Sequence, residues 1–220
     1  MTVFANRVEA GRKLASELKN TRKSAIVLAV PRGGVVVGFE VATALLIPLD
    51  IVITKKIGAP GNPELAIGAV AEDGTYFVDE RIAEMAGASQ SYIKQEVERQ
   101  KTEIKRRLKS YRGEAPNPNV QNREVIVVDD GVATGSTLKA ALRSLRKLGA
   151  KPLTVAIPVG PPDTISKLQA EADRVVCLHT PEPFYAIGEF YVDFEQTSDE
   201  EVKDLLRRAK EELQGREVTA

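Results

Sequence analysis

Apolar positions along this chain follow two periods, and the alternation between the two predicts a mixed α/β fold. Continuous apolar runs, which are typical of strands buried on both faces of a parallel sheet, occur at residues 25–30, 49–53, 125–128, 153–157 and 174–178. Apolar residues at helical spacing predict helices at residues 4–18, 36–46, 138–148, 164–171 and about 199–213. Strands that alternate with helices form right-handed βαβ units, so the pattern predicts an open, Rossmann-like parallel sheet.

The middle of the chain departs from this alternation. Residues 55–74 are rich in glycine, proline and charge, and Asp73-Gly74 indicates a hairpin turn into residues 75–78. Residues 92–111 have the thin apolar stripe of a long, charged helix. We therefore expect a single domain over residues 1–220, with a core over about 1–178, a helical insertion over about 89–112, and a C-terminal segment and helix over about 179–214.

Composition narrows the class of protein further. The chain has 220 residues, of which 43% are hydrophobic and 28% are charged, and this balance favours a folded domain over a disordered one. A net charge of zero gives no general attraction to nucleic acids or anionic membranes. No apolar stretch approaches membrane-spanning length, and the first residues lack a signal-peptide pattern. The single cysteine, Cys177, cannot form an internal disulfide, which fits a cytoplasmic protein, and its apolar neighbours predict that it is a core residue.

Candidate binding chemistry is concentrated in residues 125–137, Val-Ile-Val-Val-Asp-Asp-Gly-Val-Ala-Thr-Gly-Ser-Thr. A buried strand ends in two adjacent carboxylates, Asp129 and Asp130, and a glycine- and hydroxyl-rich loop leads into a helix. Ligands of open α/β sheets bind at the carboxyl ends of strands, and backbone N–H groups at a helix N-terminus bind anions. The stretch therefore predicts a sugar phosphate ligand, with Mg²⁺ nearby to offset further phosphates. A solvated strand end followed by an ordinary helix cap is the alternative interpretation.

This stretch resembles the phosphoribosyl-pyrophosphate (PRPP) signature of type I phosphoribosyltransferases, in which four apolar residues and two acids precede a loop ending in Thr-Gly-x-Thr. The resemblance implies that Asp129 and Asp130 hold the ribose 2- and 3-hydroxyls, and hold Mg²⁺ through water. It also implies that the loop binds the 5-phosphate, through Gly131, Val132, Ala133, Thr134, Gly135, Ser136 and Thr137. Residues 56–74 and 184–191 resemble a prokaryotic group of phosphoribosyltransferases whose acceptor is unassigned.

Two other strand ends carry positive charge. Arg32, Gly33 and Gly34 follow the first strand, where glycines permit close approach to a ligand and the guanidinium suits phosphate oxygens. The resemblance makes this turn a pyrophosphate loop, and a plain turn is the alternative. Lys55 and Lys56 begin the segment rich in glycine and proline, which the resemblance makes a flexible loop that closes over PRPP. In the family a basic residue of this loop contacts pyrophosphate, and the resemblance assigns that role to Lys55 or Lys56; two solvated lysines are the alternative.

The sequence indicates the acceptor site less clearly than the PRPP site. Family members that use 6-oxopurines carry an aspartate where this chain has Ala133, so the resemblance disfavours a 6-oxopurine without establishing adenine. A small C-terminal hood normally covers the acceptor, and the aromatic segment 180–194 is the candidate. Within it, Phe184, Tyr185 and Asp193 are the predicted acceptor-binding residues, since aromatic side chains can stack on a planar base. Alternatively, the aromatic residues pack against the C-terminal helix.

The resemblance implies a pentosyltransferase, which is a glycosyltransferase, acting in nucleotide salvage or synthesis. With Mg²⁺, it would transfer the phosphoribosyl group of PRPP to a nucleobase-like acceptor and release pyrophosphate. Asp129 and Asp130 would stabilise positive charge that develops on the sugar, and Arg32 and Lys56 the negative charge on the leaving group.

A PRPP-binding regulator of RNA or DNA without turnover is the main alternative function, because the second half of helix 92–111 is basic. The absence of a recognisable nucleic-acid-binding motif in the sequence disfavours this alternative. A homodimer is compatible with the resemblance, although no interface can be recognised in the sequence.

Overall fold

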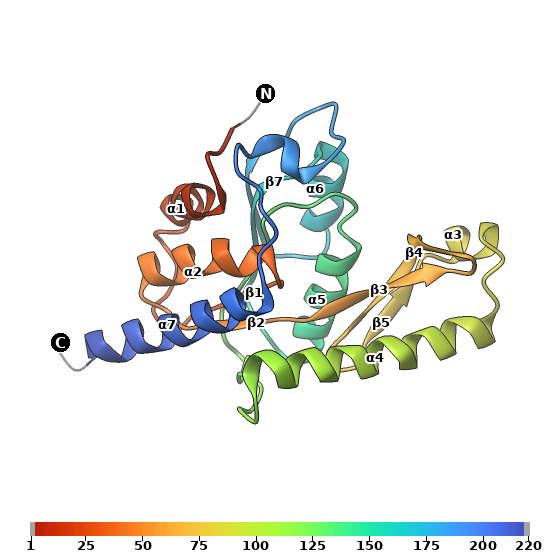
Figure 1. Cartoon of the computed structure of the whole chain (residues 1–220), viewed down its shortest axis with the longest axis horizontal. Helices are drawn as coiled ribbons and strands as arrows, with labels where there is room; N and C mark the ends of the chain where they lie inside the picture. The colour runs from red at the N-terminus through yellow and green to blue at the C-terminus, as the bar shows by residue number, and fades with distance from the viewer. Residues whose placement is uncertain (1–2, 218–220) are drawn as a thin grey trace.

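The computed structural model describes residues 3–217, and it shows a helix-covered core sheet from which a smaller sheet projects (Figure 1). Residues 1–2 and 218–220, the ends of the predicted single domain, lie outside the described residues. The core sheet has the strand order β2-β1-β6-β7-β8, and all four pairings are parallel, which confirms the predicted fold class. Its strands are β1 (Ile26–Ala29), β2 (Leu49–Ile51), β6 (Val125–Val128), β7 (Leu153–Val159) and β8 (Arg174–His179).

Helices cover both faces of the core sheet because its strands are apolar on both sides. In β6, Ile126 and Val128 face a cluster with α1 (Arg7–Glu17) and α2 (Gly33–Leu45). Val125 and Val127 face α5 (Ser136–Lys147) and α6 (Pro162–Gln169) on the other side. Burying each of these four side chains stabilises the fold by about 1.5–3 kcal/mol, and β6 is the central strand of the sheet.

The segment predicted to be a flexible loop is largely strand instead. β3 (Thr54–Ala59) and β4 (Asn62–Ala71) form an antiparallel hairpin, and β4 also pairs with β5 (Tyr76–Val78) through the predicted turn at Asp73-Gly74. A Cβ on Gly68 would overlap the backbone carbonyl of Phe77, so the strands approach closely where the sequence has glycine. That glycine content made the segment look like a loop.

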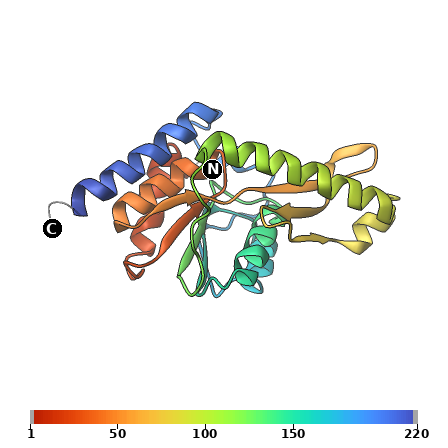
Figure 2. The same ribbon diagram turned by 90° about the horizontal axis from the view of Figure 1, so that it is seen from below.

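Two helices complete this second body, which we call the arm (residues 54–112). They are α3 (Glu80–Met85), which was not predicted, and α4 (Gln90–Arg112), which confirms the long charged helix. α4 lies along the three-stranded sheet, and together they project away from the core (Figures 1 and 2). The apolar stripe of α4, including Ile93, Val97 and Ile104, is buried in a cluster with apolar side chains of β3 and β4.

The C-terminal part of the chain returns to the core. A short 3₁₀ helix, η1 (Ile187–Phe190), lies in the hood segment (residues 180–194), and α7 (Asp199–Glu217) packs against α2. The hood segment also pairs with the N-terminal segment, since Val192 N–H donates to the carbonyl of Phe4 at 2.9 Å. Among residues 3–217, no helix is long and apolar enough to cross a membrane.

Candidate functional site

The carboxyl ends of β1 and β6 bring two predicted parts of the site into direct contact. The two strands pair in register up to Ala29 and Val128, so the turn after β1 lies beside Asp129 and Asp130. A Cβ on Gly34 would lie 2.9 Å from the Cα of Asp129, and one on Gly33 would overlap the carboxylate of Asp130. Close packing against the acid pair (Asp129 and Asp130) therefore requires glycine at both positions. The sequence predicted that the turn and the acid pair lie near each other, but not that they are in contact.

α2 begins at Gly33, three residues earlier than predicted. The first backbone N–H groups of this helix therefore lie in the glycine turn (residues 32–34), beside the acid pair. Such N–H groups bind anions because helical carbonyls do not engage them. An acid pair and an anion-binding helix start thus lie side by side at one edge of the sheet.

Asp129 is held in an environment that disfavours its charge. Its Oδ1 accepts a hydrogen bond from the backbone N–H of Asp130 at 2.8 Å. Burial, together with the negative charge of Asp130, raises the pKa of Asp129 well above its usual range. A hydroxyl donor or a cation beside Asp129 would relieve this cost.

Asp130 is engaged by two residues that the sequence did not indicate. Arg7 Nε donates to Asp130 Oδ2 at 2.7 Å, and Tyr191 Oη donates to the backbone carbonyl of Asp130 at 2.6 Å. Arg7 is 123 residues away along the chain, so no local pattern could connect the two. The one available signal was a cation in the first turn of a helix, where the helix dipole disfavours it.

The side chain of Arg32, in the glycine turn, extends toward the start of α7. The Pro31–Arg32 peptide bond is cis. Arg32 Nη1 lies 3.8 Å from Asp199 Oδ1, which also accepts a hydrogen bond from Tyr111 Oη at 2.6 Å. Burial and this hydrogen bond raise the pKa of Tyr111 to about 12. α7 thus supplies the carboxylate that pairs with Arg32, and Tyr111 at the end of α4 donates a hydrogen bond to it.

The predicted phosphate loop (residues 131–137) borders a cavity of about 800 Å³ between the core and the arm. Ala133, Thr134, Gly135 and Ser136 line it at the start of α5, whereas Gly131 and Val132 are buried beneath. The opposite walls come from the arm and from α6, and they include Lys56, Leu65, Phe77, Ile82, Thr164 and Lys167. The cavity therefore combines the helix start that binds anions with lysines and apolar side chains.

The two lysines assigned to pyrophosphate lie on opposite faces of β3. Lys56 lines the cavity together with the phosphate loop. Lys55 lies on the side of α4, where burial and the positive charge of Arg107 lower the pKa of its ammonium group. The structure thus brings Lys56 to the phosphate loop and separates Lys55 from it.

The predicted acceptor residues of the hood segment do not line this cavity. Phe184 stacks on Phe190 with ring centres 5.3 Å apart, within an aromatic cluster that also contains Phe4. Tyr185 is 78% exposed, and Asp193 Oδ1 accepts a hydrogen bond from Glu195 N at 3.1 Å. Phe184 thus packs within an aromatic cluster against the N-terminal segment, and not against the C-terminal helix as the alternative interpretation expected. The role of these residues at an acceptor stays a prediction.

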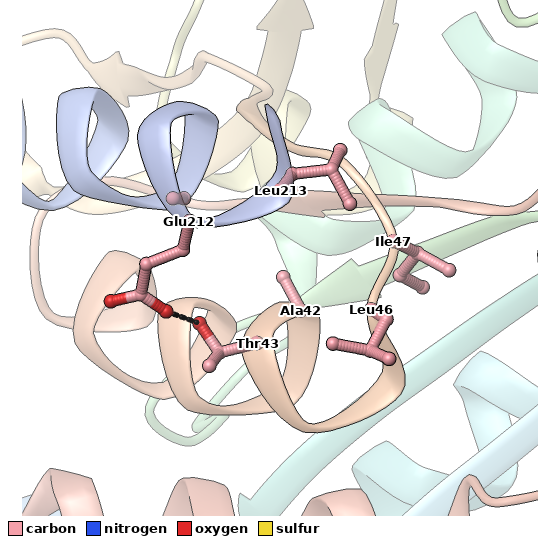
Figure 3. Close-up of a pocket in the computed structure, with 7 residues that line it drawn as sticks. Ala42, Thr43, Leu46, Ile47, Glu212 and Leu213 are labelled. Atoms are coloured by element: carbon pink, nitrogen blue, oxygen red, sulfur yellow. Dashed lines mark hydrogen bonds between the residues drawn. The ribbon is translucent and has the colours of Figure 1, made fainter. Parts of the chain in front are cut away.

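A second hollow, between α2 and α7, is too small for a ligand (Figure 3). It has a volume of about 10 Å³, which leaves room for one water molecule at most. Thr43 Oγ1 donates to Glu212 Oε2 across it at 3.3 Å. This hollow is a packing feature where the two helices meet.

The fold and the site together define the class of this protein. It is an α/β protein whose parallel sheet has an acid pair and the N-termini of two helices at its carboxyl edge, where such sheets bind their ligands. The sequence profile of the phosphoribosyl transferase domain matches residues 3–195, and the chain belongs to this family.

Individual relatives agree with this assignment. A protein of Mycobacterium tuberculosis named after the phosphoribosyl transferases is 40% identical over 210 residues, which are 95% of this chain and 47% of that protein. The chain thus spans about half the length of the curated relatives it matches. The crystal structure of TT1426 from Thermus thermophilus is 41% identical, with a TM-score of 0.80 over 94% of this chain and 99% of that one.

Proposed function

We propose that this chain binds PRPP and transfers its phosphoribosyl group to a nucleobase-like acceptor with release of pyrophosphate, in nucleotide salvage or synthesis. The observation that carries the proposal is the contact of the glycine turn with the acid pair. It puts an anion-binding helix start directly beside carboxylates suited to sugar hydroxyls, and PRPP presents its pyrophosphate and its hydroxyls on adjacent ring carbons.

The three parts of PRPP have different partners in this proposal. Asp129 and Asp130 accept hydrogen bonds from the ribose hydroxyls. The N–H groups of Gly33 and Gly34, together with Arg32, bind the pyrophosphate, which competes with Asp199 for the guanidinium. The phosphate loop and the α5 N-terminus bind the 5-phosphate, and Lys56 approaches the ligand at this end because it lines the same cavity.

The residues present fit Mg²⁺ when PRPP supplies some of the ligands. Among the described residues, no group of three or more His, Cys, Asp or Glu side chains forms a metal site. Mg²⁺ is commonly held by one or two carboxylates, waters and substrate phosphates, so Asp129 and Asp130 would hold it mainly through water. When bound, the ion would supply positive charge between the acid pair and the pyrophosphate.

The reaction exchanges one bond at C1 of the ribose for another. The C1–O bond to pyrophosphate breaks and its electron pair leaves with the pyrophosphate, while an acceptor nitrogen forms a C1–N bond and loses its proton. Positive charge develops on the sugar ring, which the acid pair stabilises. Negative charge develops on the departing oxygens, which the N–H groups of the glycine turn and the Arg32 guanidinium stabilise.

Calorimetric titration with PRPP in the presence of Mg²⁺ is the first test, followed by adenine, guanine, hypoxanthine, xanthine, uracil or orotate added to the loaded protein. We expect saturable PRPP binding and pyrophosphate release with one base. Asp129→Asn plus Asp130→Asn should abolish PRPP binding, whereas Asp204→Asn, at an exposed position of α7, should leave it unchanged. Binding without turnover for any base would favour the regulator, and no PRPP binding by the unaltered chain would refute the proposal.

A further inference from the structure

Arg7 connects three parts of the chain that are far apart in sequence. Its Nε donates to Asp130 Oδ2 at 2.7 Å, and its Nη1 donates to the backbone carbonyl of Glu195 at 2.8 Å. The guanidinium also stacks on Phe194, with Cζ 3.8 Å from the ring centre. These contacts use both the planar fork and the flat face of the group, so one orientation of Arg7 is fixed.

Stability alone does not account for the Arg7–Asp130 pair. The two side chains are only 12% and 14% exposed, and removing an ion pair from water costs about as much as the attraction returns. In addition, a cation in the first turn of α1 is disfavoured by the helix dipole. The pair therefore calls for an explanation in the geometry of the site.

The surroundings of the pair are shaped to admit it. A Cβ on Gly33 would lie 2.6 Å from Arg7 Nε and would overlap Asp130 Oδ2, so the glycine turn leaves the space that the pair fills. Tyr191 Oη holds the backbone carbonyl of Asp130 at 2.6 Å. The Tyr191 ring stacks on Phe194, 4.9 Å between centres, so the hood segment supports both Asp130 and the arginine that contacts it.

We propose that Arg7 is a positioning residue for the ribose site, which holds one oxygen of Asp130 so that the other is directed at a sugar hydroxyl. This inference rests on the proposed function. The positive charge of Arg7 also offsets part of the repulsion between the two adjacent carboxylates.

The test compares Arg7→Gln and Arg7→Lys with a matched control on the same helix. Arg12 also pairs with a carboxylate through Nε, at 2.9 Å from Glu40 Oε2, but it is distant from the acid pair and mostly exposed, so Arg12→Gln is the control. Calorimetry would measure the affinities of ribose 5-phosphate, PRPP and inorganic pyrophosphate. The first two ligands carry the hydroxyls that Asp130 binds, and pyrophosphate does not.

We expect Arg7→Gln to weaken ribose 5-phosphate and PRPP at least ~10-fold and to change pyrophosphate affinity less than ~2-fold. Arg7→Lys should recover part of the loss because the charge is retained while the fork is not. Phe194→Leu, which removes the stacking and keeps the ion pair, should give a smaller loss confined to the same two ligands. Arg12→Gln should bind all three like the unaltered chain.

Two results would overturn the inference alone. One is unchanged binding of ribose 5-phosphate by Arg7→Gln. The other is an equal loss for all three ligands with a lowered melting temperature and no recovery in Arg7→Lys, which would make Arg7 merely structural. If the unaltered chain binds pyrophosphate but neither ribose-bearing ligand, the proposed function fails and the role of Arg7 fails with it.

Discussion

The core wall and the arm wall of the site are packed to very different degrees. On the core side, Gly33 and Gly34 lie so close to the acid pair that neither tolerates a Cβ without displacement. On the arm side, Lys56 faces a cavity of about 800 Å³. One wall is fixed by backbone contacts at the ends of buried parallel strands, and the other presents a flexible side chain across open space.

This difference assigns different tolerances to the two walls. Protein interiors are close-packed, so an added atom on the core side must displace the acid pair or the turn. A substitution on the arm side changes the charge in the cavity without moving the backbone. The core wall should therefore determine whether the ligand binds at all, and the arm wall should adjust how tightly.

The largest expected effect is that of Gly33→Ala on the core wall. The new methyl group would overlap the Asp130 carboxylate and crowd Arg7, so PRPP affinity should fall by at least ~100-fold, or about 2.7 kcal/mol. Calorimetry checks this against Gly87→Ala, because Gly87 in the arm has φ +67° with open space around it. The control carries backbone strain of ~1 kcal/mol and should bind PRPP normally. Normal binding by Gly33→Ala would show that the core wall yields more readily than its packing indicates.

The next effect compares Lys56→Gln with Lys55→Gln, two changes of one charge each on adjacent residues of β3. Lys56 lines the cavity beside the phosphate loop, so its loss should weaken ribose 5-phosphate and PRPP alike, each by ~10-fold. Lys55 lies toward α4, and its loss should change either affinity less than ~2-fold. If Lys56→Gln weakened only PRPP, Lys56 would act at the pyrophosphate, as the family resemblance predicted. A larger effect of Lys55→Gln would contradict the assignment of faces.

The same contrast explains how far the sequence predicted the fold. The buried strand 125–128 was predicted to the residue, because an unbroken apolar run followed by two acids has few other interpretations. The hairpin of β3 and β4 was missed, because its strands contain Gly58, Gly68 and Pro63 and alternate weakly. Their pairing depends on α4 and the neighbouring strands, and this is information that no short window of sequence contains.

A third effect concerns stability at the core wall. The pKa of Asp129 in the folded chain lies above its ordinary value of 3.8, so the free energy of unfolding falls as pH rises above that value. Asp129→Asn removes this cost, and its amide oxygen can still accept from Asp130 N–H. The unliganded variant should melt at a higher temperature than the unaltered chain at pH 7, with no difference near pH 3.

Thermal scans at both pH values, with PRPP binding measured in parallel, check this. The variant should be more stable and should bind PRPP poorly, as expected where a site holds a charge that only its ligand relieves. A melting temperature equal to that of the unaltered chain at pH 7 would mean that Asp129 is already compensated without a ligand.

The site was less predictable than the fold for a related physical reason. Asp129, Asp130 and the glycine turn were recognisable because each lies within a few residues of a strand end. Arg7 and Tyr191 act on Asp130 from opposite ends of the chain, and only the packed hood segment brings them together. Interactions of this kind leave no periodicity and no local motif in the sequence.

The smallest effect is expected on the far side of the arm, at Glu103 of α4. Hydrogen bonds from Arg106 and Arg107 lower the pKa of Glu103 to about 2, so its contribution to stability is present above about pH 4.5 and is lost as pH falls toward 2. Since the Glu103 side chain is still 31% exposed, Glu103→Gln should lower the free energy of unfolding at pH 7 by less than ~0.5 kcal/mol in a urea titration.

The same change also frees two arginines, Arg106 and Arg107, on the basic half of α4. Duplex RNA should still not bind at physiological salt, because the unaltered helix already pairs many of its cations within the chain, among them Lys101 with Glu98 and Lys109 with Glu114. Strong, salt-dependent RNA binding by Glu103→Gln, with weaker binding by the unaltered chain, would instead make the arm a nucleic-acid surface. The core wall would then serve catalysis and the arm would serve regulation.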